Sequence, residues 1–177
     1  MRNNNKIRML TRVSLLAAMA VVLSYIETPP FLPAVPFLRL DFAAVPTAIA
    51  AMVGGLPAAA AVLLVGNAFH LLVTHTAGIG ELANFLMGFS LIWPFAVFSR
   101  SEKLLQRVTQ GVFATVSIVS IGAASNYILL LPFYGIPHDA ALDMLPWISL
   151  FNVIKGAAVS IVVGVLPNSL IHWLKRS

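Results

Sequence analysis

Four pairs of polar side chains interrupt the long apolar stretches of this sequence. The members of each pair are adjacent or three residues apart: Asn67 with His70, Glu81 with Asn84, Asn126 with Tyr127, and Asn152 with Lys155. Residues three apart lie on one face of a helix. Lipid offers such groups no hydrogen-bond partners, so we predict that they face the inside of a helical bundle. Amide, carboxyl and ammonium groups gathered in this way are suited to binding a polar ligand.

Lys155 is the most informative of these residues because it lies well inside an apolar segment. An ionisable side chain at the centre of a span costs about 2.5–3.5 kcal/mol on insertion and marks a functional site by default. A ligand contact or an ion pair therefore fits Lys155 best. Its long side chain could also reach an interface or pair with Glu81.

The other polar residues each have a structural interpretation as well. Asn67 and His70 fit hydrogen bonds between helices, worth about 0.6 kcal/mol apiece. Glu81 fits the start of a helix, where the dipole favours an anion, as well as it fits a ligand contact. Tyr127 also fits an interfacial aromatic belt.

The sequence lacks the motifs of the common catalytic classes. It has no cysteine, so it offers no disulfide, no thiolate metal ligand and no cysteine nucleophile. It has no Walker A motif with which to hydrolyse ATP itself. His70 and His75 are five apart and do not share a helix face, and no spacing suggests a Ser-His-Asp set. We expect no catalytic residue, no bound metal and no cofactor.

The composition is that of an integral membrane protein. Of the 177 residues, 59% are hydrophobic and 10% are charged, and the mean hydropathy is +0.92; soluble domains carry about 25% charged residues. We predict a single membrane domain, 1–177, that is entirely α-helical. A span needs about 20 apolar residues, and six segments compete for that role: about 9–26, 42–54, 57–74, 81–98, 110–131 and 145–173. The four prolines of the loop 27–41 exclude a regular helix there.

The basic residues predict the orientation. Nine of the eleven lie in the two terminal segments or in the loop after residue 98, whereas Arg39 lies in the loop 27–41 and Lys155 within a span. By the positive-inside rule both termini are then cytoplasmic, which requires an even number of spans. The basic and then apolar start also fits a signal peptide. However, no small-x-small cleavage site clearly follows Ile26, and five more apolar segments do.

Small residues recur four apart in two spans. Ser14 with Ala18 and Ala20 with Ser24 form one such stripe, and Gly156, Ser160 and Gly164 form the other. Such stripes allow close helix contacts, either within the bundle or with another membrane subunit. The first span has few inward polar groups, so it is the better candidate for docking a partner.

Four stretches of the chain together resemble one known family. They are FLRLDFAAVPTAIAAMVGG, NAFHLLVTHTAGIGELANFLMG, NYILLLPFYG and NVIKG. They are similar to the substrate-binding S components of energy-coupling factor (ECF) vitamin transporters, and most like the riboflavin-specific ones. The resemblance covers nearly the whole chain. It implies a six-helix membrane bundle in the bacterial plasma membrane, with both termini cytoplasmic and the loop 27–41 covering a site that opens outward.

The resemblance also implies partners and a ligand site. An S component has no motor; it docks on a transmembrane coupling subunit that carries two ATPases, and it is thought to topple in the membrane to deliver its ligand. The implied docking residues are Ser14, Ala17, Ala18 and Ala20. The implied ligand contacts are Glu81, Asn84, Asn126, Tyr127, Asn152 and Lys155, with Phe31, Leu32, Phe37 and Leu40 from the loop as an apolar cover. An asparagine supplies a donor and an acceptor and a lysine only donors, so together they can bind the polar edge of a flavin ring.

Several alternatives stay open at this point. The ligand could be another vitamin, or a phosphorylated flavin such as FMN attracted by Arg39 and Lys155. The chain could instead be a small self-sufficient transporter, a membrane enzyme, or an assembly subunit without a ligand. The last is disfavoured by Asn152 and Lys155, because an idle lysine within a span is costly. No basic stripe suggests nucleic acid.

Overall fold

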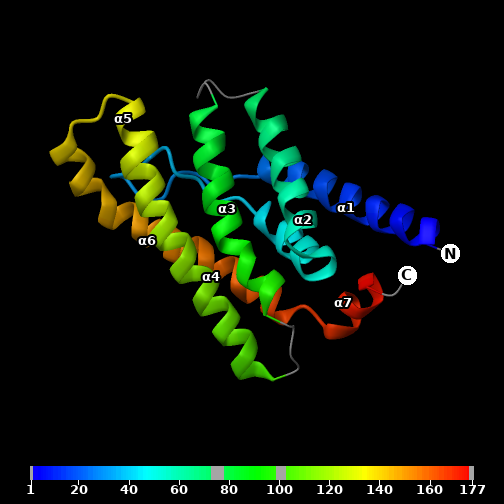
Figure 1. Ribbon diagram of the computed structural model, residues 1–177. Helices are drawn as coiled ribbons and strands as arrows, with labels where there is room; N and C mark the ends of the chain where they lie inside the picture. Colours follow the sequence, from blue (N-terminus) through cyan, green and yellow to red (C-terminus); the bar gives the residue numbers. More distant parts are fainter. Residues whose placement is uncertain (1, 73–77, 99–102, 176–177) are drawn as a thin grey trace.

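The computed structural model describes residues 2–72, 78–98 and 103–175, and the described residues form helices and no strand. The helices follow one another along the chain as Figure 1 shows: α1 Arg2–Ser24, α2 Ala44–Leu71, α3 Ile79–Val97, α4 Leu104–Ser125, the π-helix η1 Asn126–Leu130, α5 Leu131–Phe133, α6 His138–Val165 and α7 Asn168–Lys175. The all-helical class predicted from the composition is confirmed.

Five of the described stretches are long and apolar enough to cross a membrane, whereas the sequence predicted six spans. They are Lys6–Ser24, Ala44–Leu71, Ile79–Val97, Leu104–Phe133 and His138–Val165. The difference lies in α2, which joins the segments predicted at 42–54 and 57–74. The chain is therefore a multi-pass membrane protein.

Helix α2 is sharply kinked at the predicted break. Gly55 has φ 73° and ψ −169°, which is not helical, and Pro57 follows. Essentially only glycine adopts this backbone region. Figure 1 shows the short first arm of α2 turning abruptly into the longer second arm. The two arms, 44–54 and 56–71, point in different directions and contribute separate faces to the bundle.

The last predicted segment, 145–173, is divided differently in the structure. Helix α6 begins at His138 and ends at Val165, and α7 begins at Asn168. Pro137 precedes the first helical residue and Asp139 lies in the first turn, where a carboxylate favours the helix dipole. Pro167 separates the two helices, because proline cannot continue the helix before it. Pro146 is accommodated inside α6.

Helices α4 and α6 cross closely at small residues. A β-carbon on Gly156 would lie 2.9 Å from the Thr115 Cα, and one on Gly111 would lie 2.9 Å from the Ser160 Cβ. The stripe on α6 therefore serves packing within the bundle at Gly156 and Ser160. Gly164 differs, since a β-carbon there would meet nothing within 4 Å.

The stripe on α1 is divided between two faces of the helix. Ala17 and Ala20 are 5% and 2% exposed and belong to the main hydrophobic cluster, whereas Ser14 and Ala18 are exposed. The expectation that all four form a docking face is thus wrong for Ala17 and Ala20, because these two side chains already pack inside the bundle. Ser14 and Ala18 remain on the surface.

The basic segments gather at one end of the bundle. The Arg12 Nη1 donates to the Leu174 carbonyl at 2.6 Å, which joins α1 to α7. The Arg107 Nη1 donates to the Gly164 carbonyl at 2.9 Å, which joins the start of α4 to the end of α6. Figure 1 shows both chain ends on the same side of the molecule.

The loop between α1 and α2 is non-helical, as its prolines predict, and it is packed onto the opposite end of the bundle. Val35 is fully buried in a second hydrophobic cluster with Leu131, Ala141 and Ile148. The loop closes on itself where the Thr28 N–H donates to the Leu40 carbonyl at 2.8 Å and the Leu40 N–H donates to the Thr28 Oγ1 at 3.1 Å. The loop is thus an ordered cover held by α5 and α6.

Candidate functional site

A cavity of about 240 Å³ lies under this loop, at the end of the bundle away from the basic segments. It is lined by the end of α1, the loop, both arms of α2, and residues of α3, α4, η1 and α6. We call it the central cavity. The predicted contacts Phe37, Glu81, Asn84, Asn126, Asn152 and Lys155 all line it. The helices thus gather polar groups that are far apart in the sequence.

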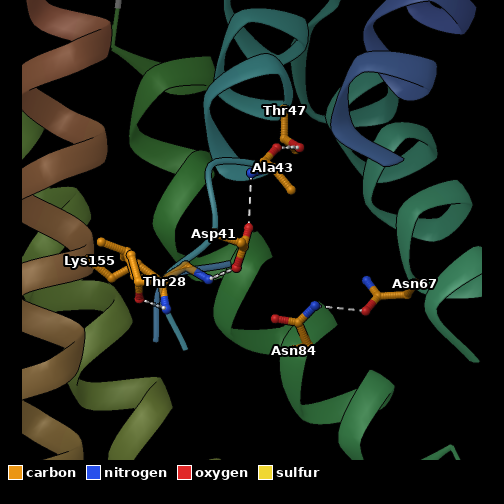
Figure 2. Close-up of polar contacts among 8 residues, drawn as sticks. Thr28, Asp41, Ala43, Thr47, Asn67, Asn84 and Lys155 are labelled. Atoms are coloured by element: carbon orange, nitrogen blue, oxygen red, sulfur yellow. Dashed lines mark hydrogen bonds and ion pairs between the residues drawn. The ribbon is translucent and has the colours of Figure 1, made fainter. Parts of the chain in front are cut away.

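Lys155 is paired with Asp41 in this cavity. The Lys155 Nζ donates to the Asp41 Oδ2 at 2.7 Å, and the two side chains are 13% and 18% exposed. The other carboxylate oxygen, Oδ1, accepts from the Ala43 N–H at 2.9 Å, just before α2 begins. Figure 2 shows Asp41 between these two donors. The ion pair considered for Lys155 exists, but its partner is Asp41 and not Glu81.

Two buried amides in the cavity wall have unused hydrogen-bonding atoms. Asn126 and Asn152 are 1% and 2% exposed. The Asn126 Nδ2 donates to the Gly122 carbonyl at 2.7 Å, but its Oδ1 has no partner among the described residues. The Asn152 Nδ2 likewise has none. Such atoms are uncommon inside proteins and each needs an explanation. One acceptor and one donor are thus unpaired within the cavity wall.

Two polar contacts join the second arm of α2 to α3. The Asn84 Nδ2 donates to the Asn67 Oδ1 at 2.9 Å, as Figure 2 shows. The His70 Nδ1 lies 3.3 Å from the Glu81 Oε1, and Glu81 is buried. The helix-bonding interpretation of Asn67 and His70 is therefore confirmed. Glu81 lies in the first turn of α3, and the N-cap residue of that helix is Gly78, which has no side chain with which to cap it.

Four other predicted contacts, all within the described residues, do not line the cavity: Phe31, Leu32, Leu40 and Tyr127. The Phe31 ring stacks on Phe151 with centroids 5.9 Å apart. Leu32 packs against the second hydrophobic cluster. The Tyr127 hydroxyl lies 2.6 Å from the His138 Nε2 on the outer side of η1. Phe31, Leu32 and Tyr127 thus pack the cover and the helix ends.

Sequence reasoning missed several lining residues, notably Asp41, Thr47, Met87, Tyr134 and Phe151. Asp41 had a detectable signal, because it is an ionisable residue placed directly before an apolar helix in a chain with few charges. Thr47 is buried and its hydroxyl donates to the Ala43 carbonyl at 2.8 Å, within its own helix. Methionine and phenylalanine in an apolar chain carried no signal.

The lysine and the arginine at the cavity are each paired with a carboxylate. Arg39 lies 3.3 Å from Glu27, and Lys155 lies 2.7 Å from Asp41. Charges near a low-dielectric interior are tolerated when they are paired in this way. Among the described residues, Arg39 and Lys155 thus each have a carboxylate beside them, so neither leaves an unpaired positive charge at the cavity to attract an anion.

Comparisons with known proteins agree with this architecture. The family described as "ECF transporter, substrate-specific component" matches residues 8–174. A "Riboflavin transporter RibU" of Staphylococcus aureus is 34% identical over 98% of this chain and 96% of its own length. A "Riboflavin transporter FmnP" of Bacillus subtilis is 29% identical over 97% and 96%.

A solved structure is also similar over its full length. It is described as "Structure and mechanism of the S component of a bacterial ECF transporter" and shares 34% identity with this chain. The TM-score is 0.77, and the match covers 99% of this chain and all of the other. Fold, sequence and family comparison agree, and the chain belongs to the substrate-specific components of ECF transporters.

Proposed function

We propose that this protein binds riboflavin in the central cavity and delivers it to an ECF transport complex. The observation that carries the proposal is the pair of unpaired buried atoms on Asn126 and Asn152, two residues that line the same cavity as Lys155. The pyrimidine edge of a flavin presents a carbonyl, an imide N–H and a second carbonyl. Its complement is a donor, an acceptor and a donor, which the Asn152 Nδ2, the Asn126 Oδ1 and the Lys155 Nζ supply.

The rest of the cavity suits the rest of the ligand. Met87, Leu91, Ile118 and Phe151 line it and provide apolar surface for a flat ring. The contacts between α2 and α3, with Asn84 and Glu81, provide polar partners for a chain of hydroxyl groups. The names of the relatives support the same ligand, since two of them are called riboflavin transporters.

Transport requires partners in this proposal. As a substrate-specific component, the chain carries the vitamin, while a membrane coupling subunit and two ATPases supply the motor. The gathering of Arg12, Arg107 and both chain ends at one end of the bundle supports a cytoplasmic location for that end. The cavity then opens toward the outside. Ser14 and Ala18, the exposed members of the α1 stripe, are the proposed contacts with the coupling subunit.

A riboflavin titration of the purified protein in detergent tests this proposal. We expect saturable quenching of tryptophan fluorescence, because Trp93, Trp147 and Trp173 report from α3, α6 and α7. Thiamine, which has no isoalloxazine ring, is the matched negative ligand. A folded, ligand-free preparation that shows no response to riboflavin would sink the flavin assignment. The family assignment would stand, and a panel of other vitamins would follow.

FMN is expected to bind at least about tenfold more weakly than riboflavin, a difference of about 1.4 kcal/mol. Its phosphate brings a charge of about −1.5 to −2. Arg39 and Lys155, the two cations that line the cavity, are both engaged with carboxylates. Competition titrations of riboflavin-loaded protein with FMN at fixed ionic strength measure the ratio. Equal affinities would mean that the phosphate stays outside the cavity in solvent.

A further inference from the structure

The Asp41–Lys155 pair joins two parts of the cavity wall that are far apart in the sequence. Asp41 is at the junction of the covering loop with α2, and Lys155 lies in α6. Both residues line the central cavity, and their 2.7 Å contact spans 114 positions in sequence. An interaction of this kind fixes the position of a side chain that has four rotatable bonds and would otherwise be mobile.

We infer that Asp41 is the positioning residue that holds the Lys155 ammonium in place for the ligand, an inference that rests on the proposed riboflavin function. An ammonium has three donors, and one is used by the Asp41 Oδ2. Two donors remain for a ligand carbonyl. A single anchored donor fixes the direction in which the other two can point, so the carboxylate determines where a carbonyl is recognised.

Asp41 is itself held, which a positioning residue requires. Its Oδ1 accepts from the Ala43 N–H at 2.9 Å, and its backbone lies between Leu40, bonded to Thr28, and the first turn of α2. Figure 2 shows this chain of contacts from the loop through Asp41 to Lys155. The loop and α6 are thereby linked at the proposed binding site. A ligand that bonds to Lys155 is therefore connected to the covering loop through Asp41.

The same pair also neutralises a lysine within a span, and this structural role predicts a different result. Removing one partner of a buried ion pair leaves the other charge unpaired and destabilises the fold, whereas removing both is much better tolerated. Stability should therefore recover in a double variant. Ligand recognition should not recover, since a neutral pair has no ammonium to donate.

A double-mutant cycle separates the two roles. Riboflavin affinity and apparent melting temperature are measured for wild-type protein, Asp41→Asn, Lys155→Met and the double variant. We expect each single change to lower the affinity by about tenfold or more, and the double variant to lose no more than the worse single one, because Asp41 acts through Lys155. The melting temperature of the double variant should equal or exceed that of Lys155→Met. If one single variant does not fold, the double variant is compared with the other single variant. This comparison still shows whether the second change adds a further loss of affinity.

Two further readouts decide the interpretation. The visible absorption band of bound flavin responds to hydrogen bonds at its carbonyls, so we expect it to move in Asp41→Asn. Asp143→Asn removes an exposed carboxylate of α6 that does not line the cavity, and it should match the wild type. Wild-type affinity or an unmoved band in Asp41→Asn, or single losses that simply add, would overturn the inference. A wild-type protein that ignores riboflavin would instead overturn the proposed function, and the flavin part of the inference with it.

Discussion

Replacing Asn152 with leucine should make the ligand-free protein more stable and should greatly weaken riboflavin binding. The Asn152 Nδ2 is buried without a partner among the described residues, and a buried polar group in this state costs about 1–3 kcal/mol. Leucine has nearly the same shape and no such cost. In the complex, however, the flavin carbonyl would lose its donor and become the unpaired group, so we expect the affinity to fall by about 100-fold or more.

Asn126→Leu should lower affinity in the same way but change stability less. Its Oδ1 is unpaired, while its Nδ2 donates to the Gly122 carbonyl and contacts the Met87 sulfur at 3.7 Å. The stability gained by removing the unpaired Oδ1 is thus offset by the stability lost with these two contacts.

Asn67→Leu is the matched control for stability. Both polar atoms of the Asn67 amide are hydrogen-bonded. Its Oδ1 accepts from the Asn84 Nδ2, and its Nδ2 donates to the Leu63 carbonyl. Its replacement should therefore lower the apparent melting temperature. The three variants are compared by thermal unfolding without ligand and by riboflavin titration. A lower melting temperature for Asn152→Leu, with riboflavin affinity preserved, would contradict the assigned role of this amide.

The opposite effects expected on stability and on affinity show what kind of site this is. A fold selected only for stability would leave neither an acceptor nor a donor unpaired in a nearly dry wall. Both atoms are held by local geometry: the Asn126 amide is fixed by Gly122, and a β-carbon on Gly122 would lie 2.3 Å from the Asn152 Nδ2. Because Gly122 on α4 has no side chain, there is room beside it for the Asn152 amide of α6. If the proposed function is right, this donor and this acceptor are already held in place in the ligand-free protein, which lowers the cost of binding.

The sequence predicted those features that depend on one segment at a time. Composition predicted membrane helices, prolines predicted the loop, and Gly54 to Pro57 predicted the break in α2. The three-residue spacing of Glu81 with Asn84 and of Asn152 with Lys155 predicted that each pair shares a face, and the structure places all four on the central cavity. Local spacing is sufficient for this because it depends only on helix geometry.

Features that depend on two segments could not be predicted in this way. Nothing in the sequence indicates that Lys155 meets Asp41 and that Glu81 meets His70, because the choice follows from how helices and loop pack together. Tyr127 is next to Asn126, but adjacent residues on a helix point in different directions, so one lines the cavity and the other does not. The same reasoning explains why Ala17 is buried while Ala18 is exposed.

Gly156→Ala should strongly destabilise the bundle, although alanine favours helix formation. The added β-carbon would lie 2.9 Å from the Thr115 Cα, which is backbone and cannot rotate away. Helices α4 and α6 would have to separate, and overpacking of this kind costs about 1–3 kcal/mol. Close approach of small residues is also a main source of helix association in membranes. Because Lys155 and Asn152 lie on the same helix beside this contact, riboflavin affinity should fall together with stability.

Gly164→Ala is the matched control on the same helix, and its effect on stability should have the opposite sign. A β-carbon at Gly164 would meet nothing within 4 Å, so alanine adds no clash and gains about 1 kcal/mol in helix propensity. Thermal unfolding in detergent should therefore place Gly156→Ala below the wild type and Gly164→Ala at or above it. Equal melting temperatures for the two variants would mean that α4 and α6 do not depend on this close contact. The geometry of Asn152 and Lys155 would then have to be maintained by the loop and α2, through Asp41, rather than by the helix crossing.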